Sequence, residues 1–222
     1  MFRSYGWLLT IFCLYEFRLT LIFIVIVLSI QSAGASDIHE LIVTEDAGIY
    51  YITVSAVIAT SDKHVRQVIT DYVHAYRINN SIIKSEVLPS PIEGNIRVKA
   101  IVLCCTPLFC REAERVDEVS TLASGDIRAV IVPDESDFSS GEAIWKITPD
   151  GNKTYLVYRA SIEPDFFIPP IIGTRMVIDN LRKQFMNIFF RIEQVALIKE
   201  EREWSDNFGV STVSTQINVN LQ

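Results

Sequence analysis

The sequence predicts an α+β fold in which a curved antiparallel sheet packs against one long helix near the C-terminal end. Two observations support this prediction. Over residues 174–199, apolar side chains recur mostly three or four places apart, without an internal glycine or proline. Over residues 82–163, short strand-like runs are separated by turn residues with no helical stretch between them, so the strands are expected to pair as antiparallel neighbours.

The first 35 residues are expected to lie outside this fold. Residues 19–30 form an uncharged apolar run followed by Ala33, Gly34 and Ala35, which is typical of a signal peptide cleaved after Ala35. Residues 1–18 are also apolar, so the two runs together could instead form an uncleaved membrane anchor. The signal peptide is favoured and predicts an exported protein, periplasmic or secreted. The alternative is a protein anchored to the membrane by this segment.

The folded domain is predicted over residues 36–199, and its first strand over residues 49–58, where apolar side chains occupy alternate positions. The segment that follows begins with hydroxyl and carboxylate side chains suited to capping a helix. Its apolar residues then repeat at helical spacing. This pattern predicts two short helices after the first strand.

Six further strands are expected before the long helix, each bounded by turn-forming residues. One of them, over 111–119, is charged on both sides and predicts an exposed strand. The sheet then has about seven strands, and the long helix covers its apolar face. Residues 200–222 are polar and predict a disordered tail. The six strands are expected at 82–88, 96–103, 111–119, 127–132, 142–148 and 154–163.

The acidic composition excludes one class of partner. The chain carries a formal net charge of −7. Loss of the first 35 residues would make it more negative, because they contain Arg3 and Arg18 but only Glu16 as an acidic residue. An acidic surface repels phosphate backbones, so nucleic acid is not expected as a partner.

The cysteine spacing allows a small disulfide loop. Cys105 and Cys110 flank a turn-sized insert, so they could form a bridge in an oxidising compartment and leave Cys104 free. The alternative is that all three are small, buried apolar residues. No CxxC pair or nearby histidine accompanies them, so neither a metal site nor a cofactor is expected.

The apolar volume enclosed between the curved sheet and the helix is the expected functional site. Small inward residues opposite the helix, Ala100, Ala129 and Ala160, leave room there for a ligand. Taken singly, each inward residue is more often plain core. The candidate cavity residues are Val98, Ala100, Ile127, Ala129, Ile131, Trp145, Leu156, Tyr158, Ala160, Phe166, Ile178, Leu181, Phe185 and Phe189.

The connection between the last strand and the long helix, residues 163–170, is the second candidate feature. Its prolines stiffen the chain before the helix, and it carries Phe166 and Phe167. These side chains could gate the mouth of the cavity or contact a membrane surface. Alternatively, they fasten the start of the helix to the sheet.

Catalytic signatures are scarce. The three histidines are scattered, and the motifs of zinc proteases, serine hydrolases and phosphate-binding loops are absent from the sequence. Arg97, Arg159, Glu163 and Asp165 could act as a proton relay if they converged in a pocket. In the alternation along their strand, Arg159 and Glu163 occupy outward positions. This favours the interpretation that both side chains lie at the solvated surface instead. Enzymatic activity is therefore uncertain and less expected than binding.

Several local strings resemble the START-like superfamily, also described as the polyketide cyclase/coenzyme Q-binding or SRPBCC superfamily. The resemblance covers roughly residues 49–196 and is greatest to the exported bacterial branch. No string in it is a catalytic signature. The strings that carry it are Asp71-Tyr72 with Asn80 and Ile83, Val132-Pro133 before Ser136-Asp137-Phe138, Gly141 with Trp145, Pro164-Asp165-Phe166, and Pro169-Pro170-Ile171-Ile172-Gly173.

The resemblance implies a helix-grip fold, with about seven antiparallel strands wrapped round the C-terminal helix and a hydrophobic ligand between them. It also implies a signal peptide and a cysteine pair near Cys105 and Cys110. We therefore expect an exported, non-enzymatic carrier of a quinone, isoprenoid or acyl lipid. The alternatives are a polyketide cyclase or dehydratase that uses the same cavity, and an envelope interaction module with a fully packed interior.

Overall fold

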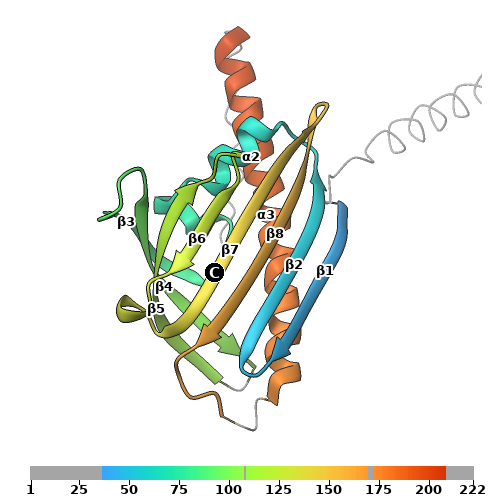
Figure 1. Cartoon of the computed structure of the whole chain (residues 1–222). Helices are drawn as coiled ribbons and strands as arrows, with labels where there is room; N and C mark the ends of the chain where they lie inside the picture. The colour runs from blue at the N-terminus through green and yellow to red at the C-terminus, as the bar shows by residue number, and fades with distance from the viewer. Residues whose placement is uncertain (1–36, 108, 170–172, 209–222) are drawn as a thin grey trace, which may run out of the picture. The chain divides into compact units, whose positions relative to one another are not determined.

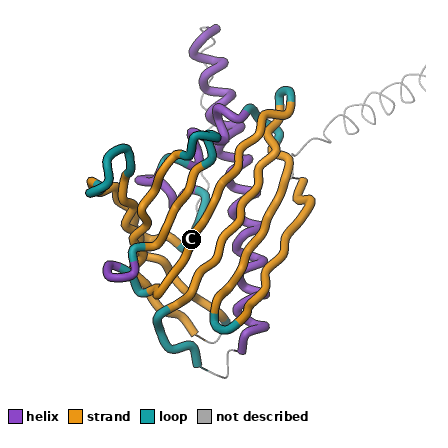
Figure 2. Tube along the Cα trace, in the orientation of Figure 1, coloured by secondary structure: helices purple, strands orange, loops and turns teal. Residues whose placement is uncertain are grey.

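The computed structural model describes residues 37–107, 109–169 and 173–208, which form an eight-stranded antiparallel sheet and the helices that pack against it (Figures 1 and 2). The strand order is β1-β2-β8-β7-β6-β5-β4-β3. The predicted α+β class is confirmed, with one strand more than the sequence indicated. The strands are β1 (Asp37–Asp46), β2 (Ile49–Ile58), β3 (Ile82–Pro89), β4 (Ile96–Thr106), β5 (Phe109–Thr121), β6 (Ile127–Ile131), β7 (Phe138–Asp150) and β8 (Lys153–Pro164).

The strand that the sequence did not predict is β1, at one edge of the sheet. A tight turn at Ala47 and Gly48, which both have positive φ angles, leads directly from β1 into β2. Val43 is the one buried residue of β1, and most of the strand is polar. An edge strand pairs on one side only and tolerates such a composition, so it shows little of the alternation that reveals a central strand.

The register of the sheet decides which side chains face its concave side. β7 and β8 pair Trp145 with Tyr158, and β4 and β5 pair Ala100 with Arg115. The long helix α3 (Gly173–Phe208) lies along the sheet, behind the strands in Figure 1. Side chains from both sheet and helix therefore enter the space between them.

Two short helices, α2 (Asp62–Ile69) and η1 (Tyr72–Arg77), follow β2. Val65 and Val68 of α2 are buried in the main core. The hydroxyl of Thr154 donates a hydrogen bond of 2.7 Å to the carbonyl oxygen of Thr60, which fixes the turn that leads into α2. The predicted pair of short helices is confirmed, but it follows the second strand because β1 was not foreseen.

α3 is amphipathic, and its buried side forms much of the core. Phe189, Ile192 and Ala196 are completely buried, whereas Met186 and Phe190 are exposed. Residues three, four and seven places apart share a face of a helix, so this division follows from the sequence pattern.

The end of α3 differs from the prediction. The helix continues to Phe208, so the predicted boundary at Lys199 is wrong. Its last turns are held by α2: Nε2 of His64 lies 2.9 Å from Oε2 of Glu203, and Lys63 forms an ion pair with the same carboxylate. These polar residues resemble a solvated tail in the sequence because their partners are distant along the chain.

Two further predictions concern residues outside the described ranges. They are the signal peptide or anchor over residues 1–35 and the part of the predicted tail beyond residue 208. Among the helices of the described ranges, none is long and apolar enough to cross a membrane.

A disulfide joins Cys105 and Cys110 at the β4–β5 hairpin, where the two residues are paired in register. The predicted bridge is confirmed. Cys104 is a free thiol.

Candidate ligand-binding cavity

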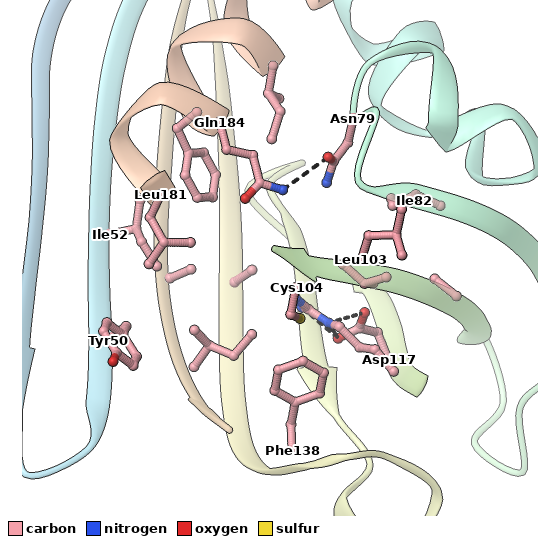
Figure 3. A pocket seen from close by; sticks show the side chains of 18 of the residues that line it. Tyr50, Ile52, Asn79, Ile82, Leu103, Cys104, Asp117, Phe138, Leu181 and Gln184 are labelled. Carbon is pink, nitrogen blue, oxygen red and sulfur yellow. Dashed lines mark hydrogen bonds and ion pairs between the residues drawn. The ribbon is translucent and has the colours of Figure 1, made fainter. Parts of the chain in front are cut away.

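A cavity of about 320 Å³ lies between the concave face of the sheet and α3. Figure 3 shows Tyr50 and Ile52 of β2, Cys104 of β4, and Leu181 and Gln184 of α3 around this space. Its volume falls at the lower end of the range for small-molecule pockets, about 300–1,000 Å³. The interior is therefore not completely filled by side chains.

Most of the predicted cavity residues line this space. Small side chains on the sheet and aromatic side chains from both sheet and helix are among them. Their contact with a ligand stays a prediction. The residues are Val98, Ala100, Ala129, Trp145, Tyr158, Ala160, Phe166, Leu181 and Phe185.

The remaining predicted residues belong to the packed core rather than to the cavity wall. Alternation along a strand predicts the face on which a side chain lies, but not whether neighbours cover it. Their assignment to the cavity is therefore corrected to core packing. They are Ile127, Ile131, Leu156, Ile178 and Phe189.

Three aromatic rings of the cavity wall pack against one another. The ring centroids of Trp145 and Tyr158, which are paired across β7 and β8, lie 4.3 Å apart. Phe185 of α3 stacks on Tyr158 with a centroid distance of 5.1 Å and an interplanar angle of 29°. Stacked aromatic rings form a rigid apolar surface suited to a hydrophobic ligand.

A charged pair, Arg115 and Asp117 of β5, lies in the wall of this apolar space. Nε of Arg115 donates to both carboxylate oxygens of Asp117, at 3.0 and 2.8 Å, and Nη2 donates to Oδ1 at 2.8 Å. Figure 3 shows these contacts as dashed lines at Asp117, beside Cys104. The side chains are 22% and 14% exposed. Both side chains are therefore mostly buried.

Sequence reasoning missed this pair. The prediction of an exposed strand over 111–119 is wrong, since Ala113 and Val116 are buried. Arg115 and Asp117 lie two residues apart and therefore on one face of β5. The sequence did contain a signal for it: two opposite charges at positions that share a strand face with the apolar residue Ala113. Charged residues on the other face of the same strand obscured it.

Two other polar side chains of the cavity are neutral. Burial raises the pKa of Tyr158 to about 12, an effect that Arg115 opposes and Asp117 reinforces. Burial also raises the pKa of the Cys104 thiol to about 11. Neither group is therefore set up to exchange a proton near neutral pH.

Polar contacts hold the first half of α3 against the far wall of the cavity. Nδ2 of Asn180 donates to the carbonyl oxygen of Cys105 at 2.6 Å. Nε2 of Gln184 donates to Oδ1 of Asn79 at 3.2 Å and to Oγ of Ser81 at 2.8 Å. Figure 3 shows the contact between Gln184 and Asn79 across the space. The helix is thus fastened to both the disulfide-bonded hairpin and the segment before β3.

The two phenylalanines of the β8–α3 connection have different roles. Phe166 lines the cavity and packs edge-on against Phe138, with centroids 5.8 Å apart, and the Arg111 guanidinium lies 4.6 Å from its ring centroid. These contacts fasten the connection to the sheet, and membrane contact through Phe166 and Phe167 stays a prediction. Phe167 is 74% exposed.

The proton relay considered from the sequence does not assemble. Arg97 forms an ion pair with Glu118, outside the cavity lining. Arg159 and Asp165 are exposed, and Glu163 accepts a hydrogen bond from Ser140. Within the part of the chain that the structure describes, no group of three or more His, Cys, Asp or Glu side chains is placed to hold a metal ion.

No family model matches the chain, and no curated protein matches it by sequence. Solved structures do match. A protein from Thermus thermophilus superposes with a TM-score of 0.56 at 15% identity, over 67% of this chain and 98% of its own. A STAR-related lipid transfer protein from Xanthomonas axonopodis gives 0.51 at 15% identity, over 70% of this chain and 98% of its own. The chain has the START-like fold.

The Zhui aromatase/cyclase from a Streptomyces species also shares the START-like fold, with a TM-score of 0.51 at 14% identity over 70% of this chain and 96% of its own. One neighbour is thus named as a lipid transfer protein and another as an aromatase/cyclase. The START-like fold alone therefore does not separate a carrier from an enzyme. The distinction between a carrier and an enzyme therefore depends on the side chains of the cavity.

Proposed function

We propose that this protein binds a hydrophobic small molecule, such as a quinone, isoprenoid or acyl lipid, and carries it unchanged. The observation that carries this proposal is the unfilled volume of about 320 Å³ inside a START-like fold, with walls made mainly of apolar and aromatic side chains. Burial of apolar surface contributes about 25 cal/mol per Å², so such walls retain an apolar molecule.

A cyclase or dehydratase is the second candidate, and the Arg115–Asp117 pair inside the cavity is the observation in its favour. Catalysis of this kind needs a group that accepts a proton near neutral pH. The carboxylate of Asp117 already accepts three hydrogen bonds from Arg115. Burial keeps Tyr158 and Cys104 protonated, with pKa values of about 12 and 11. These features favour binding over chemistry.

We also propose that the protein is exported. The apolar run over residues 19–30, followed by Ala33-Gly34-Ala35, supports a signal peptide. The Cys105–Cys110 disulfide supports an oxidising compartment. The exposed Phe167, next to the cavity-lining Phe166 and Ile168, supports contact of this loop with a membrane surface during ligand transfer.

Binding of the neutral fluorophore N-phenyl-1-naphthylamine tests the proposed binding function. The wild-type protein should enhance its fluorescence at one site per chain. Ala129→Asp and Phe185→Asp place an unpaired carboxylate in the cavity and should abolish the signal. Ala123→Asp, at an exposed position, is the matched control, and circular dichroism checks that each variant is folded. A wild-type protein that binds no fluorophore, or a folded Ala129→Asp variant that binds as the wild type does, would contradict the proposal.

A further inference from the structure

We infer that two copies of this chain associate through β1, so that their sheets join across a two-fold axis at Ile42. This inference goes beyond the proposed function, because it concerns the edge of the sheet and not the cavity. Three features carry it: the direction of the backbone groups of β1, the exposed apolar side chains beside β1, and the distribution of charge along it.

Alternate backbone groups of β1 point away from the sheet, because β1 pairs with β2 on one side only. Asp46 and Ile49 flank a two-residue turn, and residues in that position exchange hydrogen bonds with each other. Backbone groups alternate in direction along a strand, so those of Leu41, Val43 and Glu45 face away from β2. They form a row of donors and acceptors along the edge.

These outward groups are open to a further strand. Within the described part of the chain, one side chain bonds to them: Nη2 of Arg182 donates to the carbonyl oxygen of Val43 at 3.5 Å. Residues 40–46 pair with β2 without a bulge and contain no proline. Bulges and prolines are common means by which an edge strand avoids pairing, so this stretch lacks two of them.

Exposed apolar side chains lie beside this edge on both faces of the sheet. Ile42 is 48% exposed and lies on the face opposite to the buried Val43, because successive strand residues alternate. On the other face, Met186 and Phe190 follow Arg182 by about one and two turns of α3, so they lie on the side of the helix next to β1. They are 53% and 46% exposed. A second copy paired with β1 would reduce the exposure of these side chains.

The backbone directions define how the second copy pairs. A two-fold axis at Ile42 places Leu41 opposite the partner's Val43, so that outward backbone groups meet outward backbone groups. Ile42 itself faces the partner's Ile42 as a non-hydrogen-bonded pair, in which the Cα atoms are about 4.5 Å apart and the side chains are close. The exposed isoleucine is therefore at the centre of the contact.

The charges of β1 favour this axis over its neighbours. Glu40 faces the partner's Thr44, and Glu45 lies beside the partner's His39, so no two acidic residues are opposite. An axis one residue later would set Glu40 against the partner's Asp46, and like charges directly opposite destabilise a sheet. An axis one residue earlier would centre the contact nearer to the bulge at the start of β1.

The length of this edge limits the strength of the dimer. Stable dimers bury about 1,200–2,000 Å² or more, and one pair of short strands buries less. We therefore expect a dimer that dissociates on dilution, with a dissociation constant on the order of 10–100 μM.

Sedimentation equilibrium of the protein from about 5 to 500 μM, a range that spans this constant, tests the inference. The average mass should rise from one chain toward two. Ile42→Lys places two positive charges at the axis and should hold the mass at one chain. Ile83→Lys, on the opposite edge strand β3, is the matched control, because Ile83 is 49% exposed, and it should dimerise as the wild type does.

Oxidative cross-linking locates the axis independently. In a Cys13→Ser background, Ile42→Cys should form a disulfide-linked dimer, because Cα atoms about 4.5 Å apart are within reach of a disulfide. Ile83→Cys in the same background should not cross-link. This readout decides the question even where Ile42→Lys fails to fold, as checked by circular dichroism.

A wild-type mass of one chain over the whole range would overturn the inference. So would a dimer that a folded Ile42→Lys variant retains, or one that Ile83→Lys abolishes while Ile42→Lys keeps it. Failure of Ile42→Cys to cross-link in a protein that dimerises would overturn the assigned axis. None of these results bears on the binding of the fluorophore, so the proposed function is tested separately.

Discussion

The alkylation rate of a single residue, Cys104, reports how accessible the cavity is to solvent. Its thiol lines the cavity, and burial raises its pKa to about 11. Only the thiolate reacts with iodoacetamide, so at about pH 8 the rate should be roughly a hundredfold below that of an exposed cysteine. The rate should rise with pH until about pH 11. Mass spectrometry of the alkylated protein over a pH series measures this.

A Cys13→Ser background leaves Cys104 as the reactive thiol, since Cys105 and Cys110 are joined in a disulfide. A bound ligand should slow alkylation further, because Cys104 shares the same space. A rate that levels off near pH 8.5, the ordinary range for cysteine, would show that the thiol is open to solvent.

Gly141 is a residue at which a side chain has no room. A Cβ atom there would lie 2.5 Å from Cδ1 of Ile131 and 3.0 Å from the carbonyl oxygen of Ser161. Gly141→Ala should lower the free energy of unfolding by about 1–3 kcal/mol in urea titrations. Ile131→Val removes the nearer atom, so the double variant should lose less than the sum of the two single losses. Simple additivity would show that the two positions do not clash.

Single residues also show where prediction from sequence stops. Alternation placed Ala100, Ala129 and Tyr158 toward the interior, as the structure has them. The same rule could not separate residues of the cavity wall from residues of the core. How deeply an inward side chain is covered depends on neighbours from strands that are distant in the sequence. Arg115 was missed for a related reason: Asp117 lies two residues away in the sequence, but the partial burial of both side chains is visible only when β5 is placed in the sheet.

At the scale of elements, the buried and exposed faces of α3 are expected to contribute unequally to the free energy of unfolding. Phe189 is 0% exposed and contacts the core, whereas the adjacent Phe190 is 46% exposed. Phe189→Ala should lower the free energy of unfolding by about 3–5 kcal/mol. Phe190→Ala, the same change one position along, should cost less than about 1 kcal/mol. Equal losses in thermal or urea unfolding would mean that the helix is rotated relative to the sheet.

Elements with strong periodicity were predicted well and polar ones poorly. The long helix and the central strands follow from repeated apolar positions at spacings of 3.6 and 2. β1 and the last turns of α3 were missed because tertiary pairing stabilises them. β1 is held by its register with β2, and the end of α3 by the contacts of Glu203 with Lys63 and His64.

At the scale of the whole molecule, one helix covers only part of the concave face of a curved sheet, so an unfilled space remains between the sheet and the helix. The sequence predicted the sheet, the helix and their contact. The size of the remaining space could not be predicted, since it depends on curvature and on the depth of each side chain. That space of about 320 Å³, with three packed aromatic rings and one charge pair in its wall, is the feature on which the proposed carrier function rests.

Native mass spectrometry of the purified protein, incubated with a lipid extract and kept free of detergent, tests the central claim most directly. The wild-type protein should retain one non-covalently bound molecule per chain. Ala129→Phe, which fills the cavity, should lose it, whereas Ala123→Phe at an exposed position should keep it. A wild-type spectrum with the bare protein mass alone, or equal retention by the filled variant, would contradict the claim that the space between sheet and helix is a binding site.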